Sequence, residues 1–256
     1  MFRPADLATR LAIVESSWDQ TELSQAVLRT MWTEVAQQKG VSLMEPTLVR
    51  SAVVGFGYDG SLNFTWQQAR NLGAAIGCDY YILGRGRLEP QSRGADQFVY
   101  RAWLALFLVD ARSGRLANFE FLQHERSDPA EAATSLLSDL KSTLSLFLSQ
   151  DRHRQDQPDA DLTSPPHVID LDDPDKSTQD GALQPPRILI SPKPTYTKLA
   201  QTADVTATVD LKVTFLSDGA IGAIEVVRWA GFGLDESSIE AARKIRFRPA
   251  TLRGRP

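Results

Sequence analysis

A strict alternation of apolar and polar residues runs over positions 205–215 and constrains the C-terminal part of the chain more than any other feature. The odd positions are apolar and the even positions are polar, which predicts a strand with one buried and one exposed face. Ser217, Asp218 and Gly219 then provide turn residues, and a second strand is expected over 221–229. The sequence therefore predicts a β-hairpin.

A short helix is predicted after the hairpin. Apolar residues between Leu234 and Ile245 share one face at helical spacing, and Asp235 is placed for an N-cap or a first-turn acid. The helix must end before Pro249, because a proline disfavours the helical conformation of the residue that precedes it.

Taken in order, these segments resemble the C-terminal domain of TonB family proteins. The resemblance implies a small α+β head in the periplasm, which grips a peptide of an outer-membrane receptor and passes on energy from an inner-membrane motor. It covers about the last quarter of the chain and rests on the alternating strand and on Pro194-Thr195-Tyr196-Thr197, Ser217-Asp218-Gly219, Gly233-Leu234-Asp235, the run 239–244, Phe247-Arg248-Pro249-Ala250 and Gly254-Arg255-Pro256.

The expected mechanism is β-augmentation, in which an extended peptide pairs with an exposed strand edge. In the resembled family one more strand follows the Gly-x-Pro, and this sequence ends there, so we expect an unpaired hairpin edge. A head of residues 187–256 alone is then expected to be unstable or to form a homodimer through its strands. The candidate partner-binding residues are Val205, Val209, Leu211, Val213, Arg246 and Arg248.

The alternative function is a non-transducing scaffold of the cell envelope that acts through its N-terminal domain. An enzyme is the third hypothesis, and no catalytic centre, cofactor or metal site is expected. The basic run from Arg243 to Arg255 could contact phosphates, but a solvated helix end is favoured because no aromatic stacking surface accompanies it. No nucleic-acid partner is therefore expected.

Residues 1–150 predict one α/β domain, a mixed sheet with helices packed on it. Strands are expected near 11–14, 41–43, 80–84, 98–110 and 115–122, with helices over 23–35, 47–54, 65–76 and from Pro129 onward. The segments 69–84 and 108–115 resemble the α/β domain of CsgG-like and TolB N-terminal-like envelope proteins. Overall the chain is predicted to be α+β.

Residues 151–186 are predicted to be a disordered linker, because they hold nine aspartates and six prolines and have almost no apolar periodicity. The two domains are therefore expected to move independently. The first residues lack the apolar segment of a signal peptide, so none is expected there, and no apolar stretch is long enough to predict a membrane span. A periplasmic location follows from the resemblance alone, and membrane association would require an anchor upstream of Met1.

Two further motifs invite a functional interpretation. Residues 55–60 satisfy the GxGxxG pattern of dinucleotide sites, but no strand leads into it and no helix begins at Gly60, so a loop is expected. Cys78, the only cysteine, is expected to be a small buried hydrophobe and not a nucleophile. The three histidines are too scattered for a zinc site or a triad.

Overall fold

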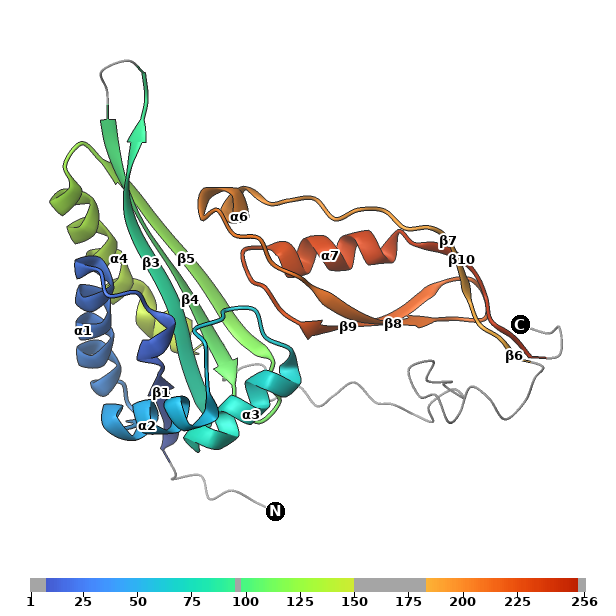
Figure 1. Cartoon of the computed structure of the whole chain (residues 1–256), viewed down its shortest axis with the longest axis horizontal. Coiled ribbons are helices and arrows are strands. Elements are labelled where there is room, and N and C mark those ends of the chain that lie inside the picture. Colours follow the sequence, from blue (N-terminus) through green and yellow to red (C-terminus); the bar gives the residue numbers. More distant parts are fainter. Residues whose placement is uncertain (1–7, 95–97, 150–182, 253–256) are drawn as a thin grey trace.

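The computed structural model describes residues 8–94, 98–149 and 183–252 (Figure 1). The N-terminal domain is organised around a five-stranded sheet with the order β2-β1-β3-β4-β5. The first three neighbours pair in parallel, whereas β3, β4 and β5 form an antiparallel meander. The strands are β1 (Thr9–Ile13), β2 (Val41–Leu43), β3 (Tyr80–Ser92), β4 (Phe98–Asp110) and β5 (Leu116–Arg126).

Helices cover the two faces of this sheet in separate layers. Helices α1 (Glu22–Ala36) and α4 (Pro129–Ser149) pack on one face, and α2 (Pro46–Phe56) and α3 (Trp66–Ile76) pack on the other (Figure 1). A short 3₁₀ turn, η1 (Glu15–Ser17), follows β1. The predicted mixed α/β sandwich is thus confirmed, and one apolar core lies on each face of the sheet.

Strand β4 explains why the sheet has two cores. It lies between β3 and β5, and its residues from Ala102 to Val109 are all buried. Because side chains alternate along a strand, Trp103 and Phe107 enter the core on the α3 side, and Leu104 and Leu106 enter the core on the α1 side. A continuous apolar run is the pattern of a strand buried on both faces.

Local signals place the helix ends as predicted. The Thr65 side chain accepts a hydrogen bond from the Gln68 N–H, and the Gln68 side chain accepts one from the Thr65 N–H, which forms a capping box at the start of α3. At its other end Gly77 adopts a left-handed conformation. Asp128 accepts hydrogen bonds from two backbone N–H groups of the first turn of α4.

The C-terminal head consists of short strands and two helices. Strands β8 and β9 form the predicted hairpin, β7 pairs with β10, and β6 pairs with β11. The elements are β6 (Leu183–Gln184), β7 (Arg187–Ile190), α6 (Lys198–Thr202), β8 (Asp210–Phe215), β9 (Ile221–Arg228), α7 (Leu234–Arg243), β10 (Arg246–Arg248) and β11 (Thr251–Leu252).

Two predicted boundaries are corrected. Strand β8 begins at Asp210 and not at position 205, because the segment before it turns toward the N-terminal domain. Strand β6 begins at Leu183, inside the segment predicted to be linker, since it pairs with β11. The rest of the predicted linker, residues 150–182, lies outside the described residues, as do positions 253–256.

Candidate protein-binding head

The β8–β9 hairpin is the part of the head where a partner strand was predicted to bind. Leu211 and Val213 lie on β8 opposite Val226 and Ile224, and both are less exposed than Asp210, which precedes them, and Lys212, which separates them. Neither strand belongs to a larger sheet within the described ranges. The long edge of β8 is therefore available for backbone pairing.

The structure does not bring the six predicted residues into one surface. Val205 and Val209 precede β8, and Val205 packs against the N-terminal core. Arg246 and Arg248 lie on β10, which pairs with β7, and both are exposed. Only Leu211 and Val213 of the six lie on the hairpin edge.

Sequence reasoning missed strand β7. Its apolar residues Ile188, Leu189 and Ile190 are each about half exposed, at 51%, 53% and 52%. Its only strand partner in the described part of the chain is β10. The apolar run Ile188-Leu189-Ile190 is the sequence signal for this strand, but it directly follows the Asp- and Pro-rich stretch that predicts a linker.

The turn between β9 and α7 docks on the N-terminal sheet. Trp229 and Phe232 are only 3% and 2% exposed, and both belong to the core cluster that contains β4. Phe232 contacts the rings of Phe107 and Phe119, with centroid distances of 5.8 and 5.0 Å. Trp229 and Phe232 thus pack into the core of the N-terminal domain, an arrangement that differs from the two independently moving domains expected from the sequence.

Polar contacts surround this aromatic contact. The Trp229 Nε1–H donates to the Gly114 carbonyl at 3.1 Å, and the Trp229 N–H donates to the Phe64 carbonyl at 3.1 Å. Asn63 holds the open end of the hairpin, since its amide donates to the carbonyls of Thr208 and Trp229 and accepts from the Thr208 N–H. Such bidentate main-chain contacts fix the position of the hairpin as well as adding energy.

The backbone of the turn is unusual. Phe232 has a φ of 55°, which costs a non-glycine residue about 1–3 kcal/mol, and it lies between two glycines that also have positive φ. A Cβ on Gly231 would lie 2.7 Å from Phe107 and 2.8 Å from Phe119. The sequence Gly231-Phe232-Gly233 thus lets the Phe232 ring pack on the face of the sheet while the backbone passes close to the rings of Phe107 and Phe119.

Asp235 stabilises the turn from its inner side. Its carboxylate accepts hydrogen bonds from the Ala230 and Gly231 N–H groups, both at 2.9 Å. The side chain is buried, and burial raises the pKa of this carboxyl to about 6. The predicted role of a first-turn acid is confirmed, but the helix N-cap is Gly233.

This pKa shift predicts a pH dependence. The folded-state pKa lies above the ordinary aspartate value, so the stabilising contribution is complete below about pH 4 and is lost as the pH rises through about 6. Asp235→Asn cannot titrate. The free energy of unfolding of the wild type, minus that of the variant, should fall by about 1.4 kcal/mol per pH unit between pH 4 and 6. A difference that stays constant in chemical denaturation over this range would contradict the burial of an ionisable Asp235.

Comparison with known proteins gives the head a family. Residues 192–256 match the family model described as Gram-negative bacterial TonB protein C-terminal. The chain carries a TonB C-terminal domain. The match includes the hairpin, the docking turn and α7, and it begins after β7. The comparison with curated proteins found no match to this chain.

Solved structures that resemble the chain have low identities. The hypothetical protein CT253 from Chlamydia trachomatis is 9% identical, with a TM-score of 0.39, over 55% of this chain and 98% of that one. Lipoprotein GNA1162 from Neisseria meningitidis is 11% identical, with a TM-score of 0.39, over 54% of this chain and 99% of that one. The LpoB C-terminal domain from Salmonella enterica is 13% identical, with a TM-score of 0.32, over 47% and 84%.

The motifs outside the TonB C-terminal domain have structural roles. The loop predicted over residues 55–60 begins only at Gly57, because Gly55 lies inside α2 and Gly57 ends that helix in a left-handed conformation. These residues therefore do not form a phosphate-binding turn between a strand and a helix. Burial raises the pKa of the Cys78 thiol to about 12, which keeps it protonated and unreactive. His124 lies 2.6 Å from the Asp139 carboxylate on the neighbouring helix.

Within residues 8–94, 98–149 and 183–252, no group of three or more histidine, cysteine, aspartate or glutamate side chains could hold a metal ion. None of the helices that the structure describes is long and apolar enough to span a membrane.

Proposed function

We propose that this chain is a binding protein of the cell envelope, located in the periplasm, whose TonB C-terminal domain takes up an extended segment of a partner protein at the edge of β8. The supporting observation is the hairpin itself, which has no third strand within the described residues. Backbone pairing would give affinity, and the side chains of Leu211 and Val213 would contact alternate residues of the partner. The chain acts by binding and not by catalysis.

The candidate partners are a peptide of an outer-membrane receptor or a component of an inner-membrane motor, as the family match suggests. In that case the head would transmit force to the receptor during transport. The second candidate function is a non-transducing envelope scaffold. The docked turn supports it, because Trp229 and Phe232 unite the two domains into one body.

A strand peptide tests the proposed binding. The peptide Val-Thr-Val-Lys-Val-Thr-Val should bind the full chain and raise its melting temperature by several degrees, since a ligand at about 100 times its Kd stabilises by about 2.7 kcal/mol. Its control has proline at two alternate positions, which removes the N–H groups that pair with an edge. Equal stabilisation by both peptides, or by neither, would contradict strand pairing.

Removing the head separates the two candidate functions. If the chain transduces energy, deletion of residues 183–256 should abolish uptake that depends on the proton gradient. A scaffold that acts through its N-terminal domain would leave that uptake intact and keep its assembly partners. The measurement is uptake of a receptor substrate in cells whose own copy has been replaced by the shortened chain.

A further inference from the structure

The two-stranded ribbon that β7 forms with β10 carries three arginines on one side. Arg248 lies directly opposite Arg187 in the ladder, and Arg246 lies two positions before Arg248 on the same strand. Because side chains alternate along a strand, Arg246 and Arg248 point away from Phe247, which is buried and contacts the Phe215 ring. All three arginines are exposed, and we call the surface that they share the basic face.

The charges of the basic face are not compensated. Like charges directly opposite each other destabilise a strand pair, and among the residues that the structure describes none of the three arginines has an ion-pair partner. The segments 183–200 and 241–252 contain seven lysines and arginines and no aspartate or glutamate. Glu240 precedes the second segment and Asp218 lies in the turn of the hairpin, and neither pairs with these arginines. Even if both acids lay beside the basic face, its three arginines would leave a positive excess.

Apolar side chains accompany these arginines on β7. Ile188, Leu189 and Ile190 are each about half exposed, and Ile190 is the ladder partner of Arg246, so it lies on the basic face. A surface with both kinds of side chain suits an anionic membrane, because cations are attracted to the lipid phosphates while apolar side chains enter the boundary with the acyl chains.

The edge of β7 is poorly suited to a partner strand. The strand is only four residues long, with Pro186 directly before it and Pro192 two positions after Ile190. Short strands and prolines are the features by which natural sheets prevent pairing at their edges. The basic face therefore favours a partner that side chains contact, such as a lipid surface, over an extended protein segment.

The basic face lies at the turn end of the β8–β9 hairpin. The contact between Phe215 and Phe247 places β10 there, whereas Trp229 and Phe232, which pack in the N-terminal core, follow the other end of β9 (Figure 1). The docked turn and the basic face are thus at opposite ends of the hairpin. The arginines consequently remain exposed in the full chain.

We propose that the basic face binds the surface of a membrane that contains anionic phospholipids. The guanidinium groups of Arg187, Arg246 and Arg248 would contact lipid phosphates, and Ile190 would enter the boundary between headgroups and acyl chains. The contact is peripheral, so it needs no anchor, in contrast to the expectation from the sequence that membrane association requires one upstream of Met1. It is also independent of strand binding at β8.

The test is adsorption of the full chain to vesicles made of equal parts of phosphatidylglycerol and phosphatidylcholine, measured by co-sedimentation at physiological ionic strength. We expect saturable adsorption to these vesicles and little adsorption to phosphatidylcholine alone. Arg246→Gln combined with Arg248→Gln should weaken adsorption roughly 30-fold, since each basic residue near an anionic surface contributes about fivefold. Ile190→Asn should weaken it about fivefold, because about half of this side chain remains to be buried. All three positions are exposed, and the melting temperature of each variant checks that it folds.

The matched control combines Arg29→Gln with Lys141→Gln. It removes two charges from exposed positions of α1 and α4, and it should adsorb as the wild type does. Failure to adsorb, equal adsorption to the neutral vesicles, equal weakening by the control, or adsorption that either head variant leaves unchanged would overturn the proposal. So would binding of soluble poly-aspartate but not of the vesicles, which would make the basic face a site for an acidic protein. None of these results bears on peptide binding at β8.

Discussion

Phe232→Ala should release the head from the N-terminal domain. The ring is buried among three phenylalanines of β4 and β5, and truncation of a buried phenylalanine costs about 3–5 kcal/mol. A loss of this size lowers a docking equilibrium by more than about 100-fold. Small-angle scattering of the full chain should show a larger radius of gyration, and limited proteolysis should cut between the domains.

The control for this experiment is Phe215→Ala. Phe215 packs on Phe247 at the opposite end of the hairpin, with a centroid distance of 4.6 Å. This change should lower the stability of the head but leave it docked, so the radius of gyration at low temperature should stay that of the wild type. If both variants keep the wild-type radius, Phe232 does not hold the domains together.

Gly231→Ala should be the most destabilising single-methyl change in the head. The added Cβ would lie within 3.0 Å of ring atoms of Phe107 and Phe119, and the residue has a φ of 71° that alanine rarely adopts. We expect a loss of roughly 2–4 kcal/mol in the free energy of unfolding, because overpacking and backbone strain add. Chemical denaturation of the full chain measures it.

Gly219→Ala provides a matched comparison. Gly219 has a φ of 87°, so alanine is strained there too, but no heavy atom lies within 4 Å of the added Cβ. Its cost should be roughly 1 kcal/mol, the strain alone. The excess at Gly231 measures the close approach of the turn to the sheet. Equal losses at the two glycines would mean that the turn is not pressed against the rings.

Local sequence signals predicted much of the fold. The helices predicted over 65–76 and from Pro129 onward begin where expected, because contacts within a few residues, such as that of Thr65 with Gln68, fix their first turns. The strand predicted over 98–110 is β4, and its residues from Ala102 to Val109 are all apolar and buried. These features depend on neighbours in the chain, which a sequence displays directly.

The docking turn could not be predicted in this way. From the sequence, Trp229 is expected at the end of a strand and Phe232 in the loop that follows. Their burial depends on Phe107 and Phe119, which lie more than 100 positions earlier in the chain. The left-handed conformation of Phe232 also contradicts the local preference of phenylalanine and is maintained only by that packing. The same limit applies to the candidate partner-binding residues, because the packing of Val205 against the N-terminal core could not be predicted from its neighbours in the sequence.

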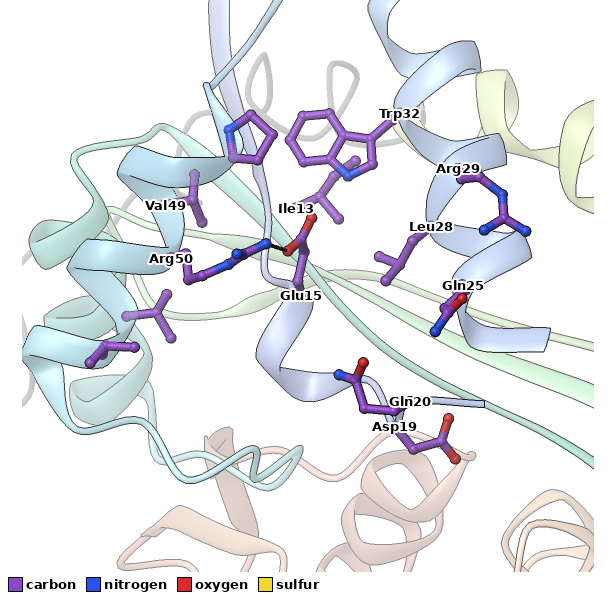
Figure 2. A pocket seen from close by; sticks show the side chains of 13 residues that line it. Ile13, Glu15, Asp19, Gln20, Gln25, Leu28, Arg29, Trp32, Val49 and Arg50 are labelled. Atoms are coloured by element: carbon purple, nitrogen blue, oxygen red, sulfur yellow. Dashed lines mark hydrogen bonds and ion pairs between the residues drawn. The ribbon is translucent and has the colours of Figure 1, made fainter. Parts of the chain in front are cut away.

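A groove between α1 and α2, at the carboxyl end of β1, was not predicted for a related reason (Figure 2). Leu28, Trp32, Val49 and Val53 all fall on apolar helix faces, and such a pattern predicts burial in a core. Only the three-dimensional arrangement shows that β2 is too short to fill the space between α1 and α2. A helix whose apolar face lines an open groove has the same sequence pattern as a helix whose apolar face packs against another helix or strand.

Residue-resolved hydrogen exchange of the full chain, with and without the alternating strand peptide, tests the central claim most directly. The claim is that the head is docked through Trp229 and Phe232 while the β8 edge is open. It predicts slow exchange at the Trp229 and Gly231 amides in both samples, and slowing at the outward amides of β8 only when the peptide is present. Fast exchange at Trp229 and Gly231, with β8 amides that do not respond to the peptide, would contradict it.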